Sequence, residues 1–281
     1  MTSSTQTQAV KAKILRDLHH GSRAVIFPNV WDVTGARVIE DAGFPAIATT
    51  SAGIANSLGY PDSQNISRDQ MLEVVRRIAT SVRVPVTADM EAGYSNTPTG
   101  LYDTAKALIA SGAVGLNLED SLDDESHLID LPLQLDKIRA LKQAGEELNV
   151  PLVVNARTDA YWWKGAKPET KMKETIARTQ AFRSVGADCV FIPGLRDLEE
   201  IKLILRESPG PLNVLAVPGW PSIPELEAAG VRRISIGSGG YRAAIGLLRI
   251  LAQHLREQGT YELIKDNAIP FAEVNDLLRR E

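Results

Sequence analysis

Three short apolar runs, each ending in polar residues or a turn, decide the fold of this 281-residue chain: VGLNLED (114–120), PLVVNART (151–158) and CVFIPG (189–194). Helical patterns fill the two intervals between them, at 133–148 and 168–185. The runs are continuously apolar and do not alternate strictly, which is typical of a parallel sheet that is covered on both faces. Strand and helix in regular succession predict repeated βα units.

The same alternation continues on both sides of this stretch. Five further strands are expected at AVIFPNV (24–30), AIATTS (46–51), PVTADME (85–91), LNVLAVP (212–218) and RISIGSG (233–239), with helical patterns at 68–82, 99–111 and 198–206. Eight βα units without a linker predict an α/β fold, a single (β/α)8 TIM barrel over about residues 24–258. A doubly wound sheet is the alternative, but nothing in the spacing marks the crossover that it would need near mid-sheet.

Two helical patterns follow the eighth strand, at 243–258 and 261–280. A barrel needs only one of them. The surplus helix contains enough leucine, isoleucine and phenylalanine to need an apolar partner, which is either the same barrel or another subunit. Residues 1–281 are therefore expected to form one domain with extra C-terminal helices.

Composition limits the classes of function. The chain is 44% hydrophobic with a formal net charge of −4, so it is globular and has no basic surplus for nucleic acid. One cysteine excludes an intramolecular disulfide framework and a multi-thiolate zinc site. No apolar stretch approaches the roughly 18 to 20 residues of a membrane span, and the start of the chain lacks a secretory signal pattern. We expect a cytoplasmic protein with no nucleic-acid or membrane partner.

Acidic residues stand where two neighbouring predicted strands end, which is the active-site end of a barrel. Asp89 and Glu91 share a face in the spacing Asp-x-Glu, and Glu119 ends the next strand. Two carboxylates about 4 Å apart in a half-buried site repel by roughly 4 kcal/mol, so a cation is expected among them. Oxygen ligands without Cys or His favour Mg²⁺, or alternatively Mn²⁺. Otherwise these acids cap helices or pair with Lys and Arg.

A basic residue and a small polar loop lie at the same predicted edge. Arg157 ends the fifth strand, where it can clamp a substrate carboxylate or, alternatively, pair with Asp159 or the acid cluster. The loop that contains Thr50, Ser51 and Ala52 offers hydroxyl and backbone N–H groups to an anion. The loop suits a carboxylate or a phosphonate, and together with Arg157 it predicts a small-molecule carboxylate as the ligand.

Six blocks in this order resemble the isocitrate lyase/phosphoenolpyruvate mutase superfamily, in its phosphonomutase and 2-methylisocitrate lyase branch. The blocks are NVWDVTGARVIEDAGFPAIATTSAGIA (29–55), GYPD (59–62), ADMEAGYS (88–95), NLEDS (117–121), NARTD (155–159) and PLNV (211–214). The resemblance covers nearly the whole chain. It implies a modified TIM barrel that binds Mg²⁺, and a dimer or tetramer whose C-terminal helices swap between subunits.

The resemblance also implies roles at the metal. Asp89 matches the direct ligand, and Glu91 and Glu119 would act directly or through water. Glu91 stands where many members have Asp, so its extra methylene could alter the coordination. Asp62 matches an acid near the reaction centre. In such enzymes an α-oxo acid or its enolate chelates the ion, whose charge stabilises the enolate.

Substrate-binding residues follow from the same resemblance. Thr50, Ser51 and Ala52 match the loop that holds the substrate carboxylate, and Arg157 matches the arginine that faces it. Asn213 matches a polar group that lines the site. Arg157 and Glu119 are expected to take part in catalysis together with Asp62.

The segment after the fourth strand departs from the family pattern. Lyases of this branch carry a Lys-Arg/Lys-Cys-Gly-His motif there and phosphonomutases carry Lys and Asn, whereas this chain reads EDSLDDESHLID (119–130). The only cysteine, Cys189, stands inside the sixth predicted strand. His127 is the candidate catalytic acid or base of the segment, with Ser121 and Tyr94 as further candidates. Each of the three is alternatively a solvent-facing residue.

These features predict a Mg²⁺-dependent lyase that cleaves a C–C bond of a small α-hydroxy or α-oxo di- or tricarboxylate through a metal-stabilised enolate, as 2-methylisocitrate lyase or oxaloacetate hydrolase does. Phosphorus–carbon chemistry of the phosphoenolpyruvate mutase or phosphonopyruvate hydrolase type is the alternative among enzymes. The acidic 119–130 segment disfavours it, because a phosphonate is highly anionic. A barrel that binds a keto acid without catalysis is the alternative of another class.

Overall fold

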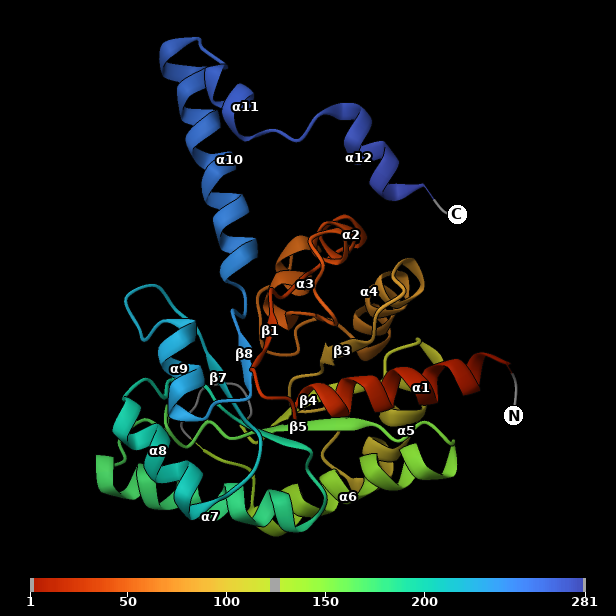
Figure 1. Ribbon diagram of the computed structural model, residues 1–281, viewed down its shortest axis with the longest axis vertical. Coiled ribbons are helices and arrows are strands. Elements are labelled where there is room, and N and C mark those ends of the chain that lie inside the picture. Colours follow the sequence, from red (N-terminus) through yellow and green to blue (C-terminus); the bar gives the residue numbers. More distant parts are fainter. Residues whose placement is uncertain (1–2, 122–126, 280–281) are drawn as a thin grey trace.

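Eight parallel strands form the centre of the protein in a computed structural model that describes residues 3–121 and 127–279 (Figure 1). Their order is β1-β8-β7-β6-β5-β4-β3-β2, so the last strand pairs with the first. The strands are β1 (Val25–Phe27), β2 (Ile47–Ala48), β3 (Val86–Asp89), β4 (Gly115–Glu119), β5 (Val153–Arg157), β6 (Cys189–Ile192), β7 (Leu212–Leu215) and β8 (Arg233–Ser235). The predicted (β/α)8 TIM barrel is confirmed.

The barrel wall has one narrow seam, between β1 and β2. These strands are joined by a single parallel bridge between Val30 and Thr49. Val30 N–H donates to Ala48 O at 2.9 Å, and Thr50 N–H donates to Val30 O at 3.0 Å. The wall is therefore nearly closed, and its seam lies beside the loop predicted to hold a substrate carboxylate.

Helices cover the outside of the barrel in the predicted alternation. A capping box between Ser67 and Gln70 begins α4, and Gly230 ends α9 with a left-handed φ of 103° that disfavours side chains with a Cβ. The helices around the barrel are α2 (Val33–Asp41), α3 (Ser51–Ser57), α4 (Arg68–Ser81), α5 (Pro98–Ala110), α6 (Leu131–Glu147), α7 (Pro168–Ser184), α8 (Leu198–Glu207) and α9 (Ile223–Ala229).

An N-terminal helix that the patterns did not predict, α1 (Ser3–Leu18), lies against the strands at their N-terminal ends (Figure 1). Leu15 is fully buried and occupies the space that a Cβ on Gly115, the first residue of β4, would need. Arg16 forms an ion pair of 2.8 Å with Asp188, directly before β6. The helix therefore closes one end of the barrel, and the site lies at the other end.

The C-terminal helices extend away from the barrel (Figure 1). α10 (Gly239–Gln258) has no buried residue, and its Leu248 is 59% exposed. The single helix predicted over 261–280 is wrong, because α11 (Glu262–Asn267) and α12 (Phe271–Leu278) are separate. Pro270 explains the break, since proline lacks an N–H donor and disfavours helical geometry in the residue before it.

α12 turns back onto the barrel side of the molecule, where Arg37 of α2 donates from Nε to Leu277 O at 2.6 Å. Phe271 at its start remains 87% exposed. Within residues 3–121 and 127–279, no helix has both the length and the apolar character that crossing a membrane requires.

Candidate active site

Acidic side chains gather at the C-terminal ends of β3 and β4, as predicted. Asp89 is the last residue of β3, Glu91 follows it in the next turn, and Glu119 is the last residue of β4. Burial raises the pKa of Glu119 well above its usual value, and Asp89 and Glu91 add to the effect. The three carboxylates are therefore within electrostatic reach of one another.

The Glu91 carboxyl lies in an environment that disfavours its charge. Burial, followed by repulsion from Asp89 and Asp62, raises its pKa to about 7. The backbone N–H of Gln64 donates to one carboxylate oxygen, and the Tyr94 hydroxyl donates to the other at 3.3 Å. Glu91 and Tyr94 have φ angles of 50° and 58°, left-handed values that are uncommon for residues with a Cβ. Such backbone conformations concentrate at functional sites.

Asp89 is fixed from two sides. The backbone N–H and hydroxyl of Ser51 donate to its Oδ2 at 3.0 and 2.8 Å, and Asn117 Nδ2 donates to its Oδ1 at 3.2 Å. Thr50 caps α3 by accepting a hydrogen bond from Gly53 N–H at 3.3 Å. Ser51, in the segment predicted to bind the substrate, therefore hydrogen-bonds Asp89, the predicted metal ligand. The sequence pattern did not indicate this contact.

Arg157, the last residue of β5, lies among the acids. Its Nη1 is 2.6 Å from Glu119 Oε2, and its Nε and Nη2 donate to the two oxygens of Asp159 at 2.6 and 3.0 Å. Burial lowers the pKa of Arg157, but Asp159 and Glu119 outweigh it and raise the pKa overall. The rings of Trp162 and Phe191 lie 5.4 and 5.8 Å from the guanidinium carbon. The pairing with Asp159 that the sequence left open is thus present.

The remaining predicted residues lie at different depths. Asp62 is exposed on the loop before α4; partial burial and Asp89 raise its pKa, whereas a hydrogen bond from the backbone of Ser63 and the charge of Arg157 lower it. Asn213 is buried inside the barrel on β7 and accepts a hydrogen bond from Ser235 at 3.4 Å. Asp62 therefore lies at the surface, and Asn213 lies in the interior of the barrel.

The segment after β4 is described in part. Ser121 donates to Asp159 and forms an antiparallel bridge with Leu128, and His127 is exposed. Residues 122–126 lie outside the described residues. The catalytic role of His127 therefore stays a prediction.

Two residues that stabilise the site were not singled out from the sequence. Asn117 shares a strand face with Glu119 and bonds Asp89, so the spacing Asn-x-Glu on β4 could have indicated it. Lys137 of α6 is fully buried and donates to Ala92 O at 2.7 Å, beneath the turn that carries Glu91. Burial lowers the pKa of Lys137 to about 8, and Glu119 opposes this shift. Lys137 stands within an ordinary helical pattern, so nothing in the sequence indicated that it is buried beside the site.

The acidic set fits a divalent cation that keeps part of its water. Among the residues that the structure describes, no three or more His, Cys, Asp or Glu side chains are spaced as a ready cage for an ion. Mg²⁺, however, typically takes only one or two protein carboxylates and retains waters that reach others. Asp89 is oriented by Ser51 and Asn117 and raises the pKa of both Glu91 and Glu119, as expected where one cation would be shared.

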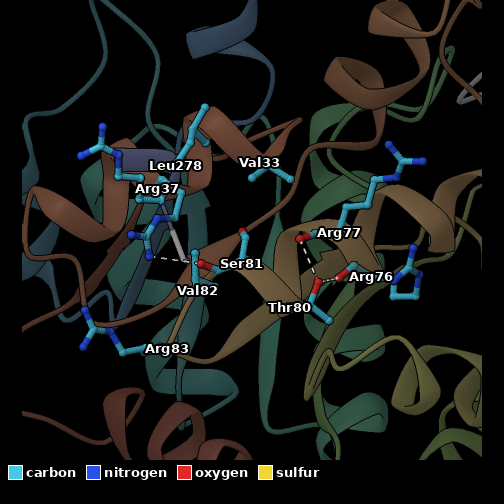
Figure 2. Close-up of a pocket in the computed structure, with 10 residues that line it drawn as sticks. Val33, Arg37, Arg76, Arg77, Thr80, Ser81, Val82, Arg83 and Leu278 are labelled. Carbon is cyan, nitrogen blue, oxygen red and sulfur yellow. Dashed lines mark hydrogen bonds between the residues drawn. The ribbon is translucent and has the colours of Figure 1, made fainter. Parts of the chain in front are cut away.

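A separate cavity of about 650 Å³ lies between α2, α4 and α12 (Figure 2). Arg76 and Arg77 both pair with Glu73, and Arg37 donates to Glu40 and to Ser81 O at the end of α4. Cations near the last carbonyls of a helix are favourable, which accounts for much of this arginine cluster. The cavity is lined by arginines far from the acidic mouth, namely Arg37, Arg76, Arg77, Arg83 and Arg279.

Glu91 should make the metal-free protein less stable as the pH rises. The carboxyl ionises above its ordinary pKa of 4.5 in the unfolded chain but only near 7 in the folded one, so protons leave on unfolding and stability falls between these values. The loss amounts to at most about 3 kcal/mol. Urea unfolding at pH 5 and 7.5 in EDTA should show this fall, and Glu91→Gln should make it smaller but not abolish it, because burial also raises the pKa of Glu119 and of Asp120. The exposed control Glu146→Gln should retain the fall; an equal fall in Glu91→Gln contradicts the assignment.

Comparisons with known proteins identify the family of the chain. Residues 15–256 match the family model for phosphoenolpyruvate phosphomutase. An uncharacterized Mycobacterium tuberculosis protein is 37% identical over 229 residues, which cover 82% of this chain and 83% of that protein. A solved Burkholderia cenocepacia structure has a TM-score of 0.90 at 34% identity, with 98% of each chain covered. An oxaloacetate decarboxylase of Rhodopseudomonas palustris is 28% identical over 92% of this chain and 86% of its own. The chain therefore belongs to the isocitrate lyase/phosphoenolpyruvate mutase superfamily and is an enzyme with a lyase-type reaction.

Proposed function

We propose that the protein is a Mg²⁺-dependent lyase that cleaves a C–C bond of a small α-hydroxy or α-oxo di- or tricarboxylate. The observation that carries this proposal is the position of Arg157 between Glu119 and Asp159, at the mouth that also contains Asp89. One mouth then offers a guanidinium for a substrate carboxylate and carboxylates for a divalent ion. The similarity to an oxaloacetate decarboxylase, which is named for a small dicarboxylate, supports this substrate class.

Asp89 is the proposed direct ligand of Mg²⁺, for which Mn²⁺ could substitute. Glu91 and Glu119 would contribute directly or through water. When bound, the ion supplies positive charge beside the substrate oxygen on which negative charge develops as the C–C bond breaks. The pairing of Asp89 with Ser51 supports this role, because it leaves the carboxylate little freedom to turn.

Arg157 would bind and orient the substrate. Asp159 occupies Nε and Nη2 in a bidentate pair, so the Nη1 side, now next to Glu119, is the part that would turn to a substrate carboxylate. Trp162 and Phe191 flank the guanidinium and would exclude water from it. Both effects strengthen a charge-assisted hydrogen bond.

Thr50, Ser51, Ala52 and Asn213 stay proposed as substrate-binding residues, and Asp62 and His127 as catalytic ones. Asn213 Nδ2 is buried without a hydrogen-bond partner among the described residues, which leaves a donor available. A buried amide without a partner loses hydration, so a ligand oxygen or water that fills this role is favourable.

Parallel assays on C–C and P–C substrates test the proposal. The protein is incubated with Mg²⁺ and oxaloacetate, 2-methylisocitrate or phosphonopyruvate, and products are followed by proton and phosphorus NMR. Cleavage of one of the two carboxylates with an unchanged phosphorus spectrum is the expected result. Conversion of phosphonopyruvate without cleavage of either would favour the mutase or hydrolase alternative and contradict the proposal.

We also propose self-association through the C-terminal helices. The support is the exposed apolar surface of α10, which includes Ile245, Leu247, Leu248 and Ile250. Leu248→Glu should raise the dissociation constant of the dimer or tetramer at least about tenfold, because a charge would be buried in the interface. Analytical ultracentrifugation measures the change, with the exposed Gln253→Glu of the same helix as a charge-matched control. An equal effect of both variants would count against the proposed interface.

A further inference from the structure

A buried arginine lies inside the barrel behind the acidic mouth. Arg233 of β8 is only 1% exposed, and it takes part in none of the ion pairs within residues 3–121 and 127–279. Its guanidinium carbon lies 4.6 Å from the ring centroid of Phe27. Burial lowers the pKa of Arg233 to about 10, with Cys189 and Asp89 opposing the shift. A buried cation without a paired carboxylate is costly, so its presence calls for a role.

Arg233 fixes the side-chain amide of Asn117. Its Nη2 donates to Asn117 Oδ1 at 3.1 Å, and Asn155 Nδ2 donates to the same oxygen at 2.8 Å. An amide whose oxygen accepts from two donors must turn its NH₂ group the other way. Asn117 Nδ2 accordingly donates to Asp89 Oδ1 at 3.2 Å, across the neighbouring strands β3 and β4 where these two residues pair in register.

Asn117 and Ser51 together fix the Asp89 carboxylate. With Asn117 on Oδ1 and both donors of Ser51 on Oδ2, the carboxylate cannot rotate without losing a bond. Asp89 is also the carboxylate within electrostatic reach of Arg233. The buried positive charge and the fixed negative charge therefore offset each other through one intervening amide.

The other side of Arg233 is held by the N-terminal helix. His19, directly after α1, accepts from Arg233 Nη1 through Nε2 at 3.3 Å. Its Nδ1–H donates to Leu15 O at 2.7 Å, which assigns the neutral tautomer. Burial and Arg233 lower the pKa of His19 to about 3, so the ring stays neutral and can accept. The helix that closes one end of the barrel thus supports the arginine that reaches toward the other end.

We propose that Arg233 is a positioning residue that acts through Asn117 to keep the Asp89 carboxylate turned toward the mouth of the barrel. The inference rests on the proposed function, in which Asp89 binds the divalent ion. Residues that orient metal ligands commonly change metal affinity or activity about 10- to 100-fold when they are replaced.

Calorimetric titration of the full chain with Mg²⁺ tests this role. Arg233→Met should weaken Mg²⁺ binding at least about tenfold. Arg233→Lys, which keeps a cationic donor, should recover most of the affinity. Arg183→Met is the matched control, because Arg183 is a half-buried arginine that donates to Ser208 and to Pro211 O, away from Asp89. Equal Mg²⁺ affinity in wild type and Arg233→Met would overturn the inference.

A double-mutant cycle separates positioning from a general loss of stability. Asn117→Ala should weaken Mg²⁺ binding to a similar extent, and adding Arg233→Met to it should cost little more, since both lie on one path. Fully additive losses would show that Arg233 does not act through Asn117. If Arg233→Met fails to fold, Asn117→Ala with unchanged affinity still overturns the inference.

Crystal structures of wild type and Arg233→Met give a readout that needs no metal. The expected change is a turned Asn117 amide and a lost hydrogen bond to Asp89, whereas an unchanged Asn117–Asp89 pair overturns the inference. Failure of the wild type to bind Mg²⁺ would instead contradict the proposed function, so the two failures are distinguishable.

Discussion

Asp89→Ala should abolish turnover and leave the fold intact. We expect kcat/KM to fall at least about a thousandfold, or about 4 kcal/mol of transition-state stabilisation, because the proposed direct ligand of the ion is lost. Folding should change little, since removal of one carboxylate relieves repulsion on Glu91 and Glu119 while it leaves Ser51 without its partner. Steady-state kinetics and a thermal melt on the same preparation measure both effects.

Asp103→Ala is the matched control for this experiment. Asp103 is an exposed acid on α5, so its removal changes the net charge equally without touching the mouth. We expect wild-type kinetics for this variant. Unchanged turnover in Asp89→Ala would refute the metal assignment, and an unfolded Asp89→Ala protein would show that Asp89 serves mainly the fold.

Arg157→Met should have the largest effect on stability. The substitution leaves the buried Asp159 and the largely buried Glu119 without their cation, and breaking one side of a buried ion pair typically costs about 3 to 5 kcal/mol. Turnover should also disappear, because the proposed contact to the substrate carboxylate is lost. The free energy of unfolding, extrapolated from denaturant curves to zero denaturant, measures the loss of stability. Initial rates measure the loss of turnover.

A second substitution distinguishes charge from packing at this position. Asp159→Asn added to Arg157→Met removes one of the two stranded negative charges, so it should restore part of the lost stability but none of the activity. If the double variant is as unstable as the single one, the loss comes from packing against Trp162 and Phe191 and not from the buried carboxylates.

The barrel could be predicted because its pattern is local. Each strand is a short apolar run, and a helix follows it, so the order of elements alone selects the fold. Two of the differences arise where the local pattern is weak. α1 has a polar composition with a few buried positions such as Leu15, and Pro270 divides a stretch that otherwise has helical periodicity.

The site was predictable at the level of strand ends. Asp89, Glu119 and Arg157 stand at the ends of β3, β4 and β5, where a barrel places its polar residues. Contacts that depend on side-chain orientation were not accessible. Nothing in the spacing shows that Ser51 bonds Asp89, or that Arg233 bonds Asn117, because the two residues of each pair come from different elements that are 38 and 116 positions apart in the chain.

The single bridge between β1 and β2 should make amide hydrogen exchange sensitive to a ligand at the proposed Thr50–Ala52 site. The N–H groups of Val30 and Thr50 donate the hydrogen bonds between the two segments, and the next residue, Ser51, donates to Asp89. Protons in such a weak joint exchange during small local openings that do not unfold the barrel. A molecule bound at Thr50–Ala52, where α3 begins, would stabilise the bridge between β1 and β2. Slower exchange of the Val30 and Thr50 amides would then report binding without any measurement of turnover.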